Sequence, residues 1–208
     1  MLPNFLYFIS IQRHFWLETT NQKGENMALF QNELDEADIL MDTRMDIQLT
    51  QLFKDTKLTL SVAESITGGM VSQRLSNLSG SSTFFHGGLV CYHPLTIVNL
   101  AQVSPATIKM GLKNGKGYAL EMARGVNNLI KTDIALSTSA LSGPESDKSE
   151  QNIFIGFKFG KIEKAIGIHF AGSKKAIREK TTQSALAFLK QNILNWLKES
   201  NIYQEENA

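Results

Sequence analysis

The chain has 208 residues, of which 42% are hydrophobic and 20% are charged, and its formal net charge is only +1. This balance excludes the basic surface with which proteins bind nucleic acid or anionic membranes, so we expect neither partner. The length and the hydrophobic content are sufficient for a single globular domain with a sizeable core.

The cysteine and histidine content argues against disulfides and metal sites. Cys91 is the only cysteine and lies within an apolar run, so we predict a buried small side chain in a reducing, cytoplasmic compartment. The four histidines, at positions 14, 86, 93 and 169, lack the spacing of zinc ligands. We therefore expect no metal and no cofactor.

Residues 1–27 begin with an apolar, aromatic segment that polar residues interrupt. It is too short and interrupted for a membrane span, and it lacks the basic start and cleavage site of a signal peptide. Two interpretations remain. One is a poorly structured extension that a translation start at Met27 or Met41 would exclude. The other is an amphipathic interfacial anchor, although the segment has no cationic face. The domain is predicted to span 28–200, with 201–208 as a tail.

Residues 28–56 contain neither Gly nor Pro, and their apolar spacing predicts one or two helices. Apolar residues alternate at 58–62, which predicts a strand, and the spacing over 68–78 predicts a helix soon after it. The sharp turn between this strand and this helix carries Glu64, Ser65, Thr67, Gly68 and Gly69.

A strand-to-helix turn of this composition can support chemistry. The N–H groups at a helix start attract anions and developing oxyanions, and glycine lets a ligand approach the backbone closely. Ser65 is therefore a candidate nucleophile or phosphate ligand. The alternative is that Ser65 and Thr67 only cap the helix.

The remaining segments continue the alternation of helices and strands. Gly87-Gly88 lies inside a predicted strand and indicates a bulge or a close backbone approach. The other predicted elements, in chain order, are a strand at 83–92, a helix from Ser104-Pro105 to Met110, a loop at 111–117, a helix over 119–130, a strand at 133–139, a hairpin at 152–170 and a helix at 173–199.

This alternation predicts an α/β fold, and the hairpin makes its sheet mixed. Ligands of such sheets bind where loops leave the carboxyl ends of the strands. Three loops are expected to converge there: Glu64 to Gly69, Tyr92 to Pro94, and Ser139 to Pro144.

These loops carry motifs of a known family. Residues 63–69 read Ala-Glu-Ser-Ile-Thr-Gly-Gly and resemble the Ala-Glu-Ser-Cys-Thr-Gly-Gly signature of the CinA C-terminal domain, to which the stand-alone nicotinamide-nucleotide amidases are equivalent. Further resemblances follow in the same order at Gly80-Ser-Ser, Gly87 to Tyr92, Leu141 to Pro144 and Ile177-Arg178. The resemblance covers about residues 45–198 and implies a three-layer α/β/α sandwich with a mixed, mostly parallel sheet.

The resemblance also implies a function. The family hydrolyses the amide of nicotinamide mononucleotide to nicotinate mononucleotide and ammonia, in the bacterial cytosol, as a homo-oligomer and without a required metal. It implies that Ser65 is the nucleophile and that Tyr92 assists it. The expected substrate-binding residues are Glu64, Thr67, Gly68, Gly69, Ser139, Ser142 and Gly143.

Several positions depart from the family pattern. The lysine expected five residues beyond Tyr92 is Ile97, which cannot act as a base. His93 is the nearest titratable substitute, or else a solvent-exposed turn residue. Ala140 and Phe154 stand where the family has glycine. Two hypotheses therefore remain: an amidohydrolase, or a catalytically impaired relative that acts in nucleotide binding or assembly.

Overall fold

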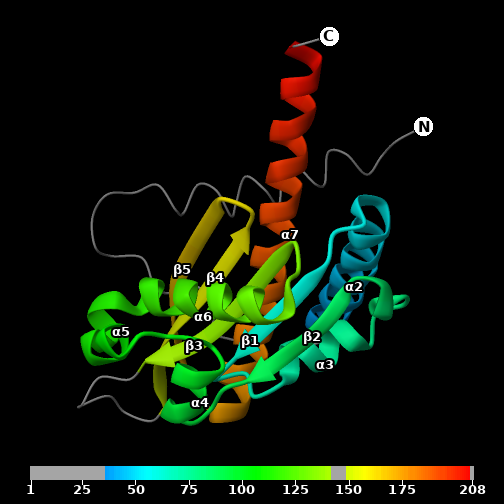
Figure 1. Cartoon of the computed structure of the whole chain (residues 1–208). Helices are drawn as coiled ribbons and strands as arrows, with labels where there is room; N and C mark the ends of the chain where they lie inside the picture. The colour runs from blue at the N-terminus through cyan, green and yellow to red at the C-terminus, as the bar shows by residue number, and fades with distance from the viewer. Residues whose placement is uncertain (1–35, 142–148, 207–208) are drawn as a thin grey trace, which may run out of the picture. The chain divides into compact units, whose positions relative to one another are not determined.

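Five strands form one sheet in the order β2-β1-β3-β4-β5 (Figure 1). β1 pairs in parallel with β2 and β3, whereas the β3–β4 and β4–β5 pairs are antiparallel, so the mixed sheet is confirmed. The strands are β1 Leu60–Glu64, β2 Phe85–Val90, β3 Ile134–Leu141, β4 Glu150–Phe159 and β5 Ile162–Ala171.

The structure is a computed structural model that describes residues 36–141 and 149–206, with side chains over 43–141 and 149–200. The described residues belong to one compact unit that begins at Glu36. The predicted extension 1–27 lies outside them, as do Ser142 and Gly143.

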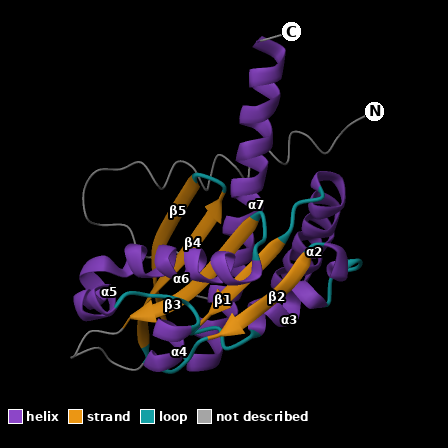
Figure 2. Ribbon diagram, viewed as in Figure 1, coloured by secondary structure: helices purple, strands orange, loops and turns teal. Residues whose placement is uncertain are grey.

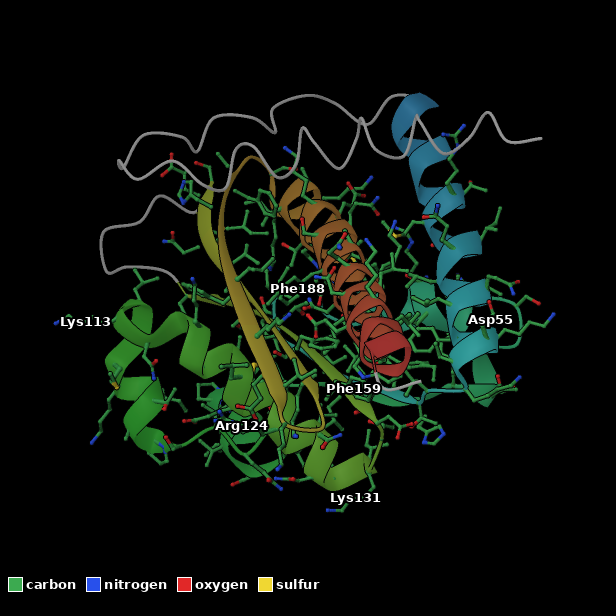
Figure 3. All side chains as sticks on the ribbon, turned by 90° about the horizontal axis from the view of Figure 1, so that it is seen from above. Asp55, Lys113, Arg124, Lys131, Phe159 and Phe188 are labelled. Carbon is green, nitrogen blue, oxygen red and sulfur yellow. The ribbon has the colours of Figure 1, made fainter. Side chains whose placement is uncertain are left out.

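Helices cover both faces of the sheet, which confirms the three-layer α/β/α arrangement (Figure 2). Figure 3 shows Arg124 of α6 on one side of the strands and Phe188 of α7 on the other. The helices are α2 Glu36–Thr56, α3 Met70–Ser76, α4 Pro94–Asn99, α5 Pro105–Met110, α6 Gly115–Ile130 and α7 Lys174–Glu206, with short 3-10 turns at Ser81–Thr83 and Gly111–Asn114.

The alternation of side chains along β1 divides the core in two. Leu60 and Val62 are buried in the larger cluster, together with side chains of α2, α3 and α7. Ala63 belongs to the second cluster, together with Met122 and Val126 of α6. Because neighbouring residues of a strand point to opposite faces, one short strand supports both helical layers.

The predicted irregularity in β2 is confirmed and has a clear geometry. Leu60 is paired with Phe85 but Ser61 with Gly87, so the register shifts by one residue. Gly87 has a φ of +146°, which favours glycine. Gly88 lies against the Ser72 side chain of α3, where a Cβ atom would overlap it. The glycine pair therefore permits both the bulge and the close packing of α3 on β2.

Several element boundaries differ from the predicted ones. β1 is displaced toward the turn relative to 58–62, because residues 60–64 are those that pair with β3. β3 continues to Leu141, since Ala140 and Leu141 still pair with β4. Ser139 and Ala140 therefore lie in a strand and not in a loop. The predicted loop at 111–117 contains the second 3-10 turn and the start of α6, and α7 continues to Glu206.

None of the helices in the described part of the chain is long and apolar enough to cross a membrane.

The packing of α6 against its neighbours can be tested at Gly125, in the middle of this helix. A Cβ atom at Gly125 would overlap the backbone carbonyl of Ala101, which is fully buried and cannot move easily. We expect Gly125→Ala to lower the free energy of unfolding, measured with urea, by about 1–3 kcal/mol, although alanine favours helices. Gly117→Ala is the control, because its Cβ atom would meet only the movable Asn114 side chain. Equal stability of the two variants would contradict the packing argument.

Candidate active site

Ser65 directly follows β1, at the carboxyl edge of the sheet. Its N–H donates to the carbonyl of Thr138 on β3 (2.9 Å), and its carbonyl accepts from the N–H of Gly68 (3.1 Å). The residue is half-buried, and its hydroxyl hydrogen-bonds to none of the residues that the structure describes. The backbone of Ser65 is therefore held on two sides while its Oγ atom stays available.

The carboxylate of Glu64 fills the start of α3. It is fully buried and accepts five hydrogen bonds. Its Oε2 atom accepts from the Thr67 hydroxyl (2.6 Å) and from the N–H groups of Gly69 (2.9 Å) and Val71 (3.1 Å). Its Oε1 atom accepts from the N–H (2.7 Å) and the hydroxyl (2.6 Å) of Ser72. A carboxylate in this position satisfies N–H groups that a helix otherwise leaves unpaired.

The same contacts explain Thr67. Its side chain is fully buried, and its hydroxyl lies 2.7 Å from the hydroxyl of Thr138 and donates to Glu64. Thr67 thus ties the turn to β3 and does not cap α3. The buried side chains of Glu64 and Thr67 stabilise the turn by hydrogen bonds within the protein. A substrate at the surface would therefore contact the backbone of the turn and not these two side chains.

The N–H groups of Gly68, Gly69 and Met70 are also occupied, by Ser65, Glu64 and Thr67 respectively. The N–H groups of Ile66 and Thr67 differ, because neither donates to any of the described residues. The N–H that follows a nucleophilic serine is a donor that acyl-transfer enzymes use for the oxyanion. Of these two groups, Ile66 has that position, directly after Ser65.

Arg178 of α7 holds the turn from outside. Its Nε and Nη2 atoms donate to the carbonyl of Thr67 (3.2 and 2.8 Å), and Nη2 lies 3.5 Å from that of Gly68. Gly68 has a φ of +57°, and a Cβ atom there would overlap the guanidinium group. The glycine therefore serves the backbone conformation and the approach of Arg178, in addition to any role in ligand binding.

The second predicted loop meets the first at this edge. The N–H of Cys91 donates to the carbonyl of Glu64 (2.7 Å), so the chain after β2 leaves the sheet beside Ser65. Tyr92 is 61% exposed. Its hydroxyl oxygen lies 3.2 Å from Nζ of Lys174, and this Nζ is 5.7 Å from the centre of the Tyr92 ring.

Sequence reasoning did not identify Lys174 or assign a site role to Arg178. β5 runs in the same direction as β3, so it ends at the same edge, and α7 starts there. The two cations are four residues apart and so lie on one face of α7. Two cationic residues four positions apart at the start of a predicted helix were the sequence signal that could have identified them.

His93 and Ile97 have defined structural roles. His93 is exposed and caps α4, its Nδ1 atom accepting from the N–H of Leu95 (3.2 Å). Ile97 is 7% exposed and packs in the second core cluster with Ala101 and Val103. The position where the resemblance places a lysine therefore faces the core.

Two other groups near the site are held in their neutral forms. Cys91 is fully buried, which confirms its predicted place, and burial raises the pKa of its thiol. Burial and then the nearby Cys91 raise the pKa of Tyr118 to about 12. A fully buried thiol cannot meet a substrate at the surface, so the half-buried Ser65 is the better candidate.

Of the third predicted loop, residues 139–141 are described, and Ser139 is the predicted substrate-binding residue among them. It is fully buried, and its hydroxyl donates to the carbonyl of Phe154 (3.3 Å). The Phe154 ring occupies the space in front of Gly115, at the start of α6. Within 43–141 and 149–200, no three His, Cys, Asp or Glu side chains are grouped closely enough to hold a metal ion.

Comparison with known proteins agrees with the motifs. The model of the CinA family, described as the CinA C-terminal domain, matches residues 42–193. A putative competence-damage inducible protein of Bacillus subtilis is 35% identical over 141 residues, which is 67% of this chain and 34% of the relative. A CinA-like protein of Sulfurihydrogenibium is 33% identical over 149 residues, which is 70% of this chain and 37% of that relative. The chain thus spans about a third of the length of these relatives.

Solved structures show the same fold. The competence damage-inducible protein A of Klebsiella pneumoniae superposes with a TM-score of 0.67 at 22% identity, covering 74% of this chain and 98% of that one. A competence-damaged protein superfamily member from Escherichia coli superposes with a TM-score of 0.66 at 21% identity, covering 82% of this chain and 99% of that one.

The buried carboxylate can be tested by a nearly isosteric change. Glu64→Gln places an amide donor against N–H and O–H donors, so at least one buried group loses its partner. We expect the free energy of unfolding in urea to fall by about 2–4 kcal/mol. Glu179→Gln is the control, since Glu179 only faces the exposed Lys175 at 3.8 Å and should change stability by less than about 0.5 kcal/mol. A Glu64→Gln protein of native stability would refute the assigned role.

Proposed function

The chain belongs to the CinA C-terminal domain family, and from this premise we propose that it is an amidohydrolase acting on nicotinamide mononucleotide. The products would be nicotinate mononucleotide and ammonia. The observation that carries the proposal is the free hydroxyl of Ser65 on a turn whose backbone is fixed by β3, Glu64 and Arg178. A nucleophile gains from such preorganisation, because little ordering is left for the reaction itself.

In the proposed reaction the Oγ atom of Ser65 attacks the amide carbon of the substrate. The hydroxyl of Tyr92 relays the proton: its oxygen accepts the proton of Ser65 while its own proton passes to the leaving nitrogen, and the N–H of Ile66 donates to the oxyanion. The C–N bond then breaks, and ammonia departs. Water hydrolyses the acyl-serine ester by the same proton transfers in reverse order.

We extend the proposal to the surroundings of the reaction. The substrate is a small nucleotide, and its phosphate would be attracted by the positive charge of Arg178 beside the turn. A homo-oligomer is supported by the exposed apolar side chains of Val90, Leu95 and Leu100, on and next to the edge strand β2. A cytoplasmic location is consistent with a single, buried cysteine.

A second candidate is a catalytically impaired relative that binds nucleotides or serves in assembly. Two observations favour it. Ile97 faces the core where the family pattern has lysine, and the Phe154 ring fills space in front of Gly115. Ile97 cannot take part in proton transfer as a lysine can, and the Phe154 ring occupies space that a glycine would leave open.

Ammonia release from nicotinamide mononucleotide by the purified chain tests the proposal. We expect Ser65→Ala to reduce the rate at least about 10³-fold, because no other group can form the ester. Ser76→Ala is the matched control, since its exposed hydroxyl on α3 only contacts the carbonyl of Gln73. Full activity in Ser65→Ala would refute the nucleophile. A native chain that binds the nucleotide in a titration but releases no ammonia would support the second candidate.

A further inference from the structure

We infer that Lys174 holds the hydroxyl group of Tyr92 in position to relay the proton of Ser65, in place of the lysine that Ile97 replaces. The inference rests on the proposed nucleophile but not on the identity of the substrate. Lys174 acts through Tyr92, so it is a positioning residue for the reaction.

The direction of the hydrogen bond supports this role. An ammonium group has three donors and no acceptor, so in the 3.2 Å contact Nζ of Lys174 donates and the Tyr92 oxygen accepts. A charge-assisted hydrogen bond of this kind fixes the direction of the Tyr92 hydroxyl group. The proton of that hydroxyl then points away from Lys174, so the Tyr92 oxygen can accept the Ser65 proton while the hydroxyl donates its own.

The start of α7 places Lys174 close to the Ser65 turn. Ile177 is 1% exposed and anchors this part of the helix in the core. Arg178 binds the carbonyl of Thr67, two residues beyond Ser65. Lys174 is four residues before Arg178, a rise of about 6 Å along a helix. One face of α7 thus contacts both the Ser65 turn and Tyr92.

Two other residues near Tyr92 or Lys174 fit this role less well. Nδ1 of His93 accepts from the N–H of Leu95 as a helix cap. The side chain of Lys175 is 86% exposed, and its Nζ atom lies near Glu179 instead of Tyr92. Lys174 is therefore the cation that the described residues bring to Tyr92.

The step is balanced without a further reactant. The O–H bond of Ser65 breaks as its Oγ bonds to the electrophilic atom, and the proton moves to the Tyr92 oxygen. At the same time the Tyr92 hydroxyl gives its own proton to the leaving group, so Tyr92 ends the step as a neutral phenol. The ammonium of Lys174 keeps its protons and holds the Tyr92 oxygen during the transfer.

A fluorophosphonate tests the inference independently of the substrate. This reagent forms a phosphonate ester with an activated serine hydroxyl and releases fluoride. The rate of labelling, followed by mass spectrometry and absent in Ser65→Ala, reports the reactivity of Ser65. We expect Lys174→Met to slow labelling at least about tenfold, and Lys174→Arg to restore most of the rate because it retains a cationic donor.

Two comparisons separate this role from a structural one. Lys175→Met, the adjacent lysine, should label at the native rate with the same melting temperature as Lys174→Met. In a Tyr92→Phe background, Lys174→Met should cause no further loss, because the lysine acts only through the tyrosine oxygen. Equal effects of the two lysine variants, a further loss in the Tyr92→Phe background, or no labelling of the native chain would each overturn the inference. Normal labelling without ammonia release would reject the proposed substrate and leave the inference intact.

Discussion

The buried carboxylate of Glu64 is the interaction on which the site depends. It accepts five hydrogen bonds from the turn and from the first residues of α3, at the point where β1 ends. A charged group in a protein interior is costly unless it is fully paired, and here every partner is a donor. The carboxylate thus takes the place that an external anion occupies at other helix starts. As a result the backbone of the turn is tied at several points, and the groups that find no partner among the described residues are the hydroxyl of Ser65 and the N–H groups of Ile66 and Thr67.

The second constraint comes from the opposite end of the chain. α7 packs Ile177 into the core and directs two cations at the loops that leave β1 and β2. Arg178 fixes backbone carbonyls, and Lys174 contacts a phenol that is open to solvent. A cation lost from α4 can be replaced by one on α7, because both helices start at the carboxyl ends of strands of the same sheet. In this chain the α4 position is the buried Ile97, and the cation at Tyr92 is Lys174 of α7.

Local patterns predicted much of the fold. The alternation in β1, the glycine pair in β2, the Ser104 cap of α5 and the β4–β5 hairpin all depend on neighbouring residues, which the sequence displays directly. The errors lie where pairing with a distant strand extends an element, as at Ala140 and Leu141 of β3. For the site, the strand-to-helix pattern selected the Ser65 turn, and the family resemblance added Tyr92, Glu64 and Thr67. The structure shows that the side chains of Glu64 and Thr67 are fully buried.

By itself the sequence determined the α/β class, the family and the position of the candidate nucleophile, because these follow from periodicity and from a short contiguous motif. Only the tertiary structure decided which groups of that motif are free. The N–H groups of Gly69 and Val71 are occupied because the chain folds back onto its own carboxylate. Likewise, Lys174 meets Tyr92, 82 residues away in the chain, because two β-strands end at one edge of the sheet.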